Sequence, residues 1–352
     1  MDLFNIYLPV AGIHFNFLLL IVIGFCVGVL GGFFGVGGGW MITPALNIFN
    51  FHMDFAIGTG FATIFGQSIG AAKKHHKMGN IDWKLGLLSI LTSIIGLEIG
   101  SDIIIALEKA GEGGVIVRWC YILLLSLLGC YMLYDYFVLH PREIKLLEAA
   151  IKKDPNSISV SIKSKFAEKL HNINLPPMIS FPTSGIDQVS IWVVFLIFLI
   201  TGFLSGFLGV GGGFIIIPAL VYLIGLPTTI AVGTSLITVL FSGAYGCFTY
   251  ATKGRVEILA SFIMLIGAAI GAQVGSTAVK YIKGYGIRLL FAITILFAAL
   301  SVVTEQFYKL TMERFFQIMA AIVLMGTTLS MASVIITRLV MESSKERKNK
   351  TI

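Results

Sequence analysis

Charged residues are scarce in this 352-residue chain, where Asp, Glu, Lys and Arg make up only 12%. That share is about half the ~25% typical of a soluble domain. In contrast, 57% of the residues are hydrophobic and the mean hydropathy is +0.92. A water-soluble fold of this size needs a more charged surface, so a soluble enzyme is excluded, and so is a disordered chain. The composition indicates a protein that crosses a membrane several times.

Cysteines and catalytic motifs are also sparse. Cys26, Cys120, Cys130 and Cys247 each lie alone in an apolar run, with no Cys-x-x-Cys and no histidine at metal-ligand spacing. We therefore predict no disulfide scaffold and no metal site. The chain also lacks a nucleotide-binding Gly-x-x-x-x-Gly-Lys-[Ser/Thr] loop, a Gly-x-Ser-x-Gly elbow and a His-Glu-x-x-His motif. These absences predict a protein that is not an enzyme, needs no cofactor and is not driven by a nucleotide.

Long apolar runs account for most of the chain. Because a helix needs roughly 20 apolar residues to cross a bilayer, we predict an all-α protein with nine spans, near 16–35, 55–73, 84–107, 115–139, 189–209, 228–251, 256–280, 286–304 and 313–340. Two shorter apolar segments, 40–51 and 214–226, each follow a glycine cluster. No Lys or Arg precedes the first run, so we predict a retained helix there rather than a signal peptide.

The chain contains an internal repeat. Residues 28–46 read GVLGGFFGVGGGWMITPAL and residues 202–220 read GFLSGFLGVGGGFIIIPAL, which are identical at 13 of 19 positions. The similarity continues downstream, with AIGTG at 56–60 and AVGTS at 231–235. We predict a first membrane repeat, a water-exposed connector, a second membrane repeat, and an additional transmembrane helix with a basic tail, at 1–139, 140–188, 189–304 and 305–352.

Basic residues gather in loops, so we interpret the net charge of +7 as a signal of orientation rather than of nucleic-acid binding. The loop 73–84 holds four lysines, and the connector and the tail are also basic. We place all three in the cytoplasm and the N-terminus outside the cytoplasmic membrane. This requires the segments 40–51 and 214–226 to cross with their glycine clusters, which makes the repeats inverted. If these segments are re-entrant and do not cross, the repeats are parallel. Within the connector, alternation at 157–163 predicts a short strand pair.

The run Gly-Val-Gly-Gly-Gly occurs once in each repeat. Consecutive glycines cost about 1 kcal/mol each relative to alanine inside a helix, so we predict a helix break at membrane depth. The helix that follows would begin with unpaired N–H groups and a positive dipole end, which favour an anion. Close helix packing is the alternative, which we accept only for the upstream glycines. The predicted substrate-binding residues of the runs are Gly35, Gly37, Gly38, Gly39, Pro44, Gly209, Gly211, Gly212, Gly213 and Pro218.

Polar residues follow both runs. We predict that a Gly-Thr pair begins the next helix of each repeat, where the hydroxyl would either cap the helix or contact the anion. Polar side chains further along would line the pore or bond to neighbouring helices. The predicted contacts are Gly58, Thr59, Gly233, Thr234 and Ser235, and the candidate pore lining is Thr63, Gln67, Ser68, Thr238 and Ser242.

Glu98 lies inside a predicted span, whereas its repeat counterpart Gln273 is neutral. An intramembrane carboxylate is costly and suggests a function, which here would be proton coupling. The alternative is that Glu98 lies near the end of its helix, with Asp102 one turn further on.

The repeated motif resembles that of the sulfite exporter TauE/SafE family of membrane permeases. The resemblance rests on Gly-x-x-x-Gly-x-x-Gly-Val-Gly-Gly-Gly-x-x-x-x-Pro-Ala-Leu, at 28–46 and 202–220, and on Gly-Thr-Ser-Leu at 233–236. The chain departs from the pattern at Gly60, where the second repeat has Ser235, and in its long connector.

The resemblance implies transport, usually export, of small organosulfur anions such as sulfite and sulfonates. We expect a secondary transporter in which backbone N–H groups at the paired glycine runs hold the anion between two repeats. An anion channel with the same pore lining is the alternative. The expected partners are a small anion and the lipid bilayer, with the oligomeric state left open.

Overall fold

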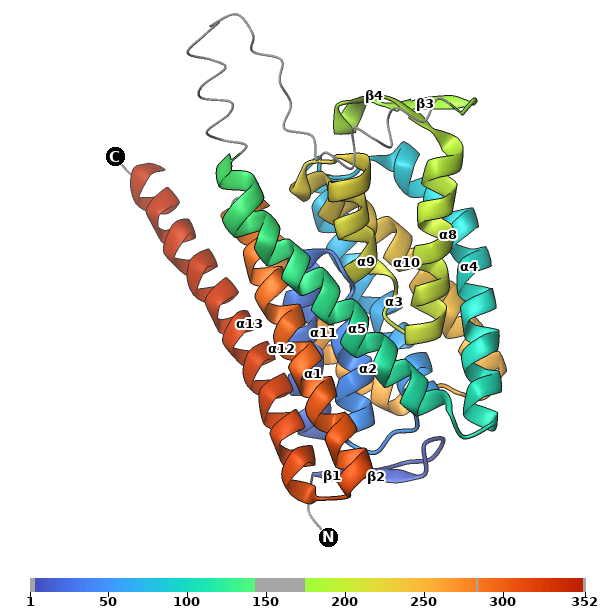
Figure 1. The fold of residues 1–352 in the computed structure, drawn as a ribbon. Coiled ribbons are helices and arrows are strands. Elements are labelled where there is room, and N and C mark those ends of the chain that lie inside the picture. Colours follow the sequence, from blue (N-terminus) through green and yellow to red (C-terminus); the bar gives the residue numbers. More distant parts are fainter. Residues whose placement is uncertain (1–3, 143–174, 283, 351–352) are drawn as a thin grey trace, which may run out of the picture.

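The computed structural model describes residues 4–142, 175–282 and 284–350. This part is helical apart from two short strand pairs, and nine of its helices are long and apolar enough to cross a membrane (Figure 1). They are α1 (Phe17–Phe34), α3 (Met53–Lys77), α4 (Trp83–Lys109), α5 (Gly113–Tyr134), α8 (Ile191–Leu208), α10 (Thr228–Thr252), α11 (Ile258–Ala278), α12 (Gly284–Thr311) and α13 (Arg314–Lys350). The prediction of a helical membrane protein with nine spans is confirmed.

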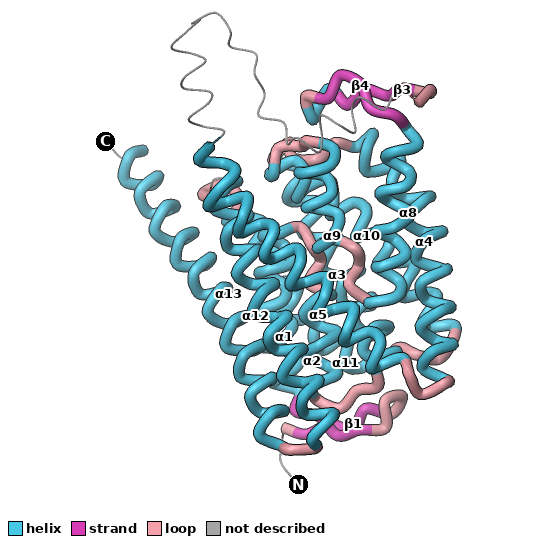
Figure 2. The backbone as a smooth tube through the Cα atoms, in the orientation of Figure 1, coloured by secondary structure: helices cyan, strands magenta, loops and turns pink. Residues whose placement is uncertain are grey.

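Each glycine run breaks a helix, as predicted. α1 is capped by Gly35 and the short helix α2 (Gly39–Ile48) follows; α8 is capped by Gly209, and α9 (Gly213–Pro218) follows and continues as the π-helix η3 (Ala219–Ile224). Three glycines in each break have φ between 68° and 79°, a conformation that glycine adopts without a steric penalty. Figure 2 shows the breaks as loops inside the helical bundle.

The Gly-Thr pairs do not begin helices, so that prediction is wrong. α3 begins at Met53 and α10 at Thr228, five residues before Gly58 and Gly233 respectively. The preceding short segments end at residues with positive φ, Asn50 and Gly225, which turn the chain early enough for the next helix to start. Both Gly-Thr pairs therefore lie inside long helices.

One antiparallel strand pair precedes the first helix of each repeat. β1 (Asn5–Leu8) pairs with β2 (Ile13–Asn16) before α1, and β3 (Met178–Phe181) pairs with β4 (Ile186–Ser190) before α8. The two pairs lie at opposite ends of the bundle (Figure 1). The sequence analysis missed both, although Pro-x-x-Gly-Ile at 9–13 and 182–186 marks them. The strand pair predicted at 157–163 lies outside the described residues.

The repeats interleave through close helix contacts. α1 packs on α11, where a Cβ added at Gly28 would lie 2.4 Å from the Ala268 carbonyl oxygen. α8 packs on α4 in the same way, because a Cβ at Gly202 would lie 2.2 Å from the Ser93 carbonyl oxygen. Small residues allow such close backbone approach between helices in a membrane. The additional helix α13 runs beside α12 along one flank (Figure 1).

Candidate functional site

The two helix breaks contact each other. A Cβ added at Gly39 would lie 2.9 Å from the Gly209 carbonyl oxygen, and one added at Gly213 would lie 2.5 Å from the Cα of Val36. Two hydrogen bonds add to this contact, one at each break. The first is at the second break, where the Thr43 hydroxyl donates to the Gly209 carbonyl at 3.1 Å. The structure thus brings together the glycine runs that the repeat predicted as one site.

The Ser235 hydroxyl makes the second of these bonds, donating to the Gly35 carbonyl at 2.7 Å. Ser235 is therefore the residue of the Gly-Thr-Ser segment that reaches a break. Its repeat counterpart is Gly60, which has no hydroxyl to offer.

Backbone N–H groups at both breaks have no partner among the residues that the structure describes. Within the described residues we find no hydrogen bond from the N–H groups of 37–40 or 211–214. All residues of both stretches are buried, and no side chain of the described residues caps the helix starts at Gly38 and Gly212. Unpaired N–H groups at a helix start form a site of positive potential. An anion can be held there without a charged side chain.

Polar side chains of α3 line the first break. The Gln67 amide donates to the Gly37 carbonyl, and a Cβ at Gly37 would lie 3.5 Å from the Ser68 hydroxyl oxygen. The Gln67 amide oxygen and the Ser68 hydroxyl are buried, and neither has a hydrogen-bond partner in the described part of the chain. At the second break the Ser205 hydroxyl is likewise buried without a partner. Free polar atoms of this kind are rare in proteins and call for an explanation.

The other candidate pore residues have protein partners or lie elsewhere. The Thr63 hydroxyl donates to the Thr59 carbonyl in its own helix, at 3.1 Å. The Thr238 hydroxyl bonds to that of Ser89 at 2.6 Å, which links α10 to α4. Ser242 is buried on α10. Contacts with a glycine run are seen for Gln67 and Ser68.

The threonine of each Gly-Thr pair forms a hydrogen bond with the backbone of the other repeat. The Thr59 hydroxyl oxygen accepts from the Glu257 N–H at 3.0 Å, and that of Thr234 accepts from the Asp82 N–H at 2.9 Å. Glycine precedes each threonine because a backbone passes over it: a Cβ at Gly58 would lie 2.1 Å from a carbonyl oxygen of the loop before α11. Contact of these pairs with substrate stays a prediction.

Asp82 and Glu257 precede α4 and α11, and their carboxylates hold the strand pairs. The Ser184 hydroxyl, between β3 and β4, donates to Asp82 at 2.6 Å. The Val10 and Ala11 N–H groups, between β1 and β2, donate to Glu257 at 2.7 and 2.8 Å. Each strand pair is thereby fixed to a helix of the other repeat.

Glu98 is half-buried on α4 and accepts from the Thr249 hydroxyl at 3.2 Å. One turn further on, Asp102 pairs with Lys253, in the loop after α10, at 2.7 Å. Glu98 therefore lies one turn from the level of the loop after α10, although its own helix continues to Lys109, and its coupling role stays a prediction.

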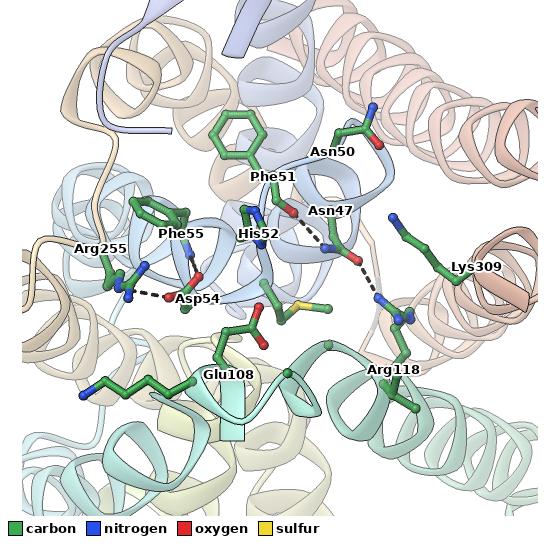
Figure 3. A pocket seen from close by; sticks show the side chains of 15 residues that line it. Asn47, Asn50, Phe51, His52, Asp54, Phe55, Glu108, Arg118, Arg255 and Lys309 are labelled. Atoms are coloured by element: carbon green, nitrogen blue, oxygen red, sulfur yellow. Dashed lines mark hydrogen bonds and ion pairs between the residues drawn. The ribbon is translucent and has the colours of Figure 1, made fainter. Parts of the chain in front are cut away.

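A polar pocket of about 600 Å³ opens at the end of the bundle that holds β1 and β2 (Figure 3). Arg118 lines it, although the residue is only 6% exposed. Its guanidinium donates to the Gln306 side chain at 2.8 Å and to the Asn47 side chain at 3.2 Å, and it lies 3.9 Å from Glu305. The sequence analysis missed Arg118, although its position inside the predicted span 115–139 was a signal.

No group of three or more His, Cys, Asp or Glu side chains that could hold a metal occurs in 4–142, 175–282 and 284–350. The site consists of backbone amides, hydroxyls, one amide side chain and a buried arginine. Groups of this kind can donate hydrogen bonds to an anion.

Comparison with known proteins gives a family match over most of the chain. The family model described as sulfite exporter TauE/SafE matches residues 20–302. A probable membrane transporter protein of Methanocaldococcus jannaschii is 27% identical over 299 residues, covering 80% of this chain and 94% of that protein. The probable membrane transporter protein YunE of Bacillus subtilis is 24% identical over 302 residues, covering 84% and 100%. No solved structure matches.

Proposed function

Since this chain belongs to the sulfite exporter TauE/SafE family of membrane transporters, we propose that it carries small organosulfur anions, such as sulfite or sulfonates, out of the cell. The anion is held by backbone N–H groups where the two glycine breaks meet. The observation that carries this proposal is the pair of buried N–H sets, 37–40 and 211–214, for which no acceptor is found among the described residues. A desolvated anion at this point would supply the missing acceptors.

Two side chains support a site at the first break. Gln67 holds the Gly37 carbonyl, which fixes the loop with its N–H groups unpaired. The hydroxyl of the adjacent Ser68 is free to donate a hydrogen bond to an anion there. A donor set built mainly from backbone favours a small oxyanion with several acceptor atoms, which is the geometry of sulfite and of a sulfonate group.

We further propose that the repeats are inverted, with the connector and the C-terminal tail in the cytoplasm. Reciprocal contacts support this arrangement, because each repeat presents a threonine to the start of a helix in the other. α1 begins beside β2 and α8 beside β4, at opposite ends of the bundle (Figure 1). Lys84, in the first turn of α4 and the last of the four lysines at 73–84, donates to the Ser180 carbonyl of β3. The end that holds β3 and β4 is then cytoplasmic.

Reconstitution tests the proposal. Purified protein in liposomes is expected to move labelled sulfite or a small sulfonate, with counterflow of trapped substrate. Gly38→Leu and Gly212→Leu should abolish this movement, because they fill the two breaks. Gly254→Leu is the matched control, since Gly254 has the same backbone conformation (φ 69°) with no atom within 4 Å of an added Cβ. Transport by both break variants at the control rate would refute the site, and flux without counterflow would favour a channel.

A further inference from the structure

Arg118 and Arg288 occupy corresponding places in the two repeats. Each lies near the start of its helix, α5 or α12, and each is followed 17 residues later by an acid, Asp135 or Glu305. Each arginine pairs with the acid of the other helix. The distance from the arginine Nη1 to the carboxylate oxygen is 3.9 Å for Arg118 and Glu305, and 3.2 Å for Arg288 and Asp135.

The Arg288 pair is closed by protein groups. The Tyr222 hydroxyl donates to the same Asp135 oxygen at 2.9 Å. The Cζ of Arg288 lies over the ring of Tyr222, 5.5 Å from the ring centroid. The Nε of Arg288 donates to the Thr228 hydroxyl at 2.8 Å. These contacts occupy the guanidinium from several sides.

The Arg118 pair is open in comparison. Glu305 is 1% exposed, yet neither of its carboxylate oxygens has a hydrogen-bond partner in the described part of the chain. Within the described residues no hydrogen bond is made by the Nη2 of Arg118 or by that of Arg288, so the two pairs differ in how their carboxylates are satisfied. A buried carboxylate 3.9 Å from an arginine and without hydrogen bonds is poorly compensated for its lost hydration. The guanidinium is thus available to a second anion.

The pocket in front of Arg118 carries excess positive charge. Its lining includes four cationic side chains, Lys109, Arg118, Arg255 and Lys309, and two acidic ones, Asp54 and Glu108. Arg255 is paired with Asp54 at 3.0 Å (Figure 3). A cleft lined mainly by one sign of charge raises the local concentration of ions of the opposite sign.

A chain of buried polar side chains connects Arg118 to the second glycine break. Arg118 contacts Asn47, which lies one turn from Thr43 on α2, and Thr43 bonds to the Gly209 carbonyl. Tyr121, one turn beyond Arg118 on α5, donates to the Leu208 carbonyl at 2.9 Å. Both steps end at the second break.

The corresponding position beyond Arg288 is apolar. Phe291 follows Arg288 as Tyr121 follows Arg118, and its ring packs on Phe34 and Trp40, with centroids 5.0 and 6.1 Å away. Phe34 and Trp40 flank the first break. Apolar packing therefore separates Arg288 from the site, whereas polar groups connect Arg118 to it.

We infer that Arg118 forms a second anion site, in the pocket from which polar side chains lead to the second glycine break, and that it takes a small oxyanion with a sulfonate-like or carboxylate group. Glu305 competes with this anion for the guanidinium. Arg288 is the repeat-related site in its closed form, with Asp135 in the place of the anion. The inference rests on the proposed function in that the anion bound by Arg118 is the one that proceeds to the breaks.

Calorimetric titration of the purified full-length protein in an uncharged detergent, with methanesulfonate as the probe, tests the inference. Glu305→Gln should bind methanesulfonate severalfold more tightly than the unmodified chain, because the competing carboxylate is gone. The double variant Arg118→Gln/Glu305→Gln should bind about 10- to 100-fold more weakly than Glu305→Gln, as expected from the loss of charge-assisted hydrogen bonds. The double variant leaves no unpaired buried carboxylate, so its folding is protected.

Lys109→Gln is the control, because it removes a positive charge from an exposed residue of the same pocket and should change affinity less than about threefold. Equal affinity of Glu305→Gln and the double variant, or weaker binding by Glu305→Gln than by the unmodified chain, would overturn the Arg118 site. Gly38→Leu separates the two proposals. If it still transports, the break site fails while the Arg118 titration stands. If it no longer transports but Glu305→Gln still tightens methanesulfonate binding in the Gly38→Leu background, both proposals are supported.

Discussion

The hydroxyl of Thr59 on α3 accepts a hydrogen bond from the backbone N–H of Glu257, 198 residues further along the chain, at 3.0 Å. The second repeat makes the same contact in reverse, from Thr234 to Asp82 at 2.9 Å. Each repeat thus caps the start of a helix that belongs to the other. Together with the packing of α1 on α11 and of α8 on α4, this exchange means that neither repeat completes its own packing.

Replacement of Thr59 by valine should destabilise the fold by about 1–3 kcal/mol, because the buried N–H of Glu257 loses its acceptor. Thermal unfolding in detergent measures the change. Thr63→Val on the same helix is the control, since that hydroxyl bonds only to a carbonyl of its own helix and should change stability little. A Thr59→Val protein of normal stability that has lost transport would instead indicate a direct contact with substrate.

Replacement of Gly28 by alanine should lower the unfolding temperature and the yield of folded protein. The added Cβ would lie 2.4 Å from the Ala268 carbonyl oxygen, so α1 and α11 must separate, and overpacking of this kind typically costs about 1–3 kcal/mol. Gly326→Ala on α13 is the matched control, because no atom lies within 4 Å of the added Cβ. There, alanine should leave stability unchanged or raise it by up to about 1 kcal/mol. Similar unfolding temperatures for both variants would contradict the close approach of α1 and α11.

The helices and their breaks could be predicted because their signals are local. Apolar runs mark the spans, and consecutive glycines weaken a helix enough to favour the break seen at each run. The strand pairs were missed because strands of four or five residues are too short for periodicity to identify, although Pro9 and Gly12 recur as Pro182 and Gly185. Glycine at position 58 suggested a helix boundary, whereas it admits a neighbouring backbone.

The side-chain partners of the site could not be predicted from one sequence. Arg118 meets Gln306 and Glu305, more than 180 residues away, through packing of α5 on α12. The spacing of charges within either helix does not reveal this pairing. What the sequence does contain is the repeat itself, in which Arg118 and Arg288 are equivalent. Comparison of all ionisable residues between the repeats, beyond Glu98, would have identified both.

Replacement of Ser68 by alanine should slow transport by about tenfold without loss of stability. The Ser68 hydroxyl is buried without a partner in the described part of the chain, so its removal relieves an unsatisfied group and should leave the unfolding temperature unchanged or slightly higher. Transport falls if the hydroxyl donates to the anion, since such a bond is worth about 1.5–3 kcal/mol. Initial rates in liposomes provide the measurement. Ser276→Ala, which removes a buried hydroxyl bonded within α11, should transport at the normal rate. Normal transport by Ser68→Ala would remove this residue from the site.

Single cysteines at positions 77 and 252 should be labelled from opposite sides of the membrane. Lys77 and Thr252 are the last residues of α3 and α10, they are exposed, and they hold equivalent places in the two repeats. Inverted repeats place such a pair on opposite faces, whereas parallel repeats place it on the same face. The background needs replacement of Cys26, Cys120, Cys130 and Cys247. A membrane-impermeant maleimide applied to intact cells should modify the cysteine at 252, and the cysteine at 77 should react only after permeabilisation, because lysine-rich loops stay inside. Equal labelling of both cysteines in intact cells would establish parallel repeats. It would also contradict the assignment of Arg118 and Arg288 to positions related by an inverted repeat.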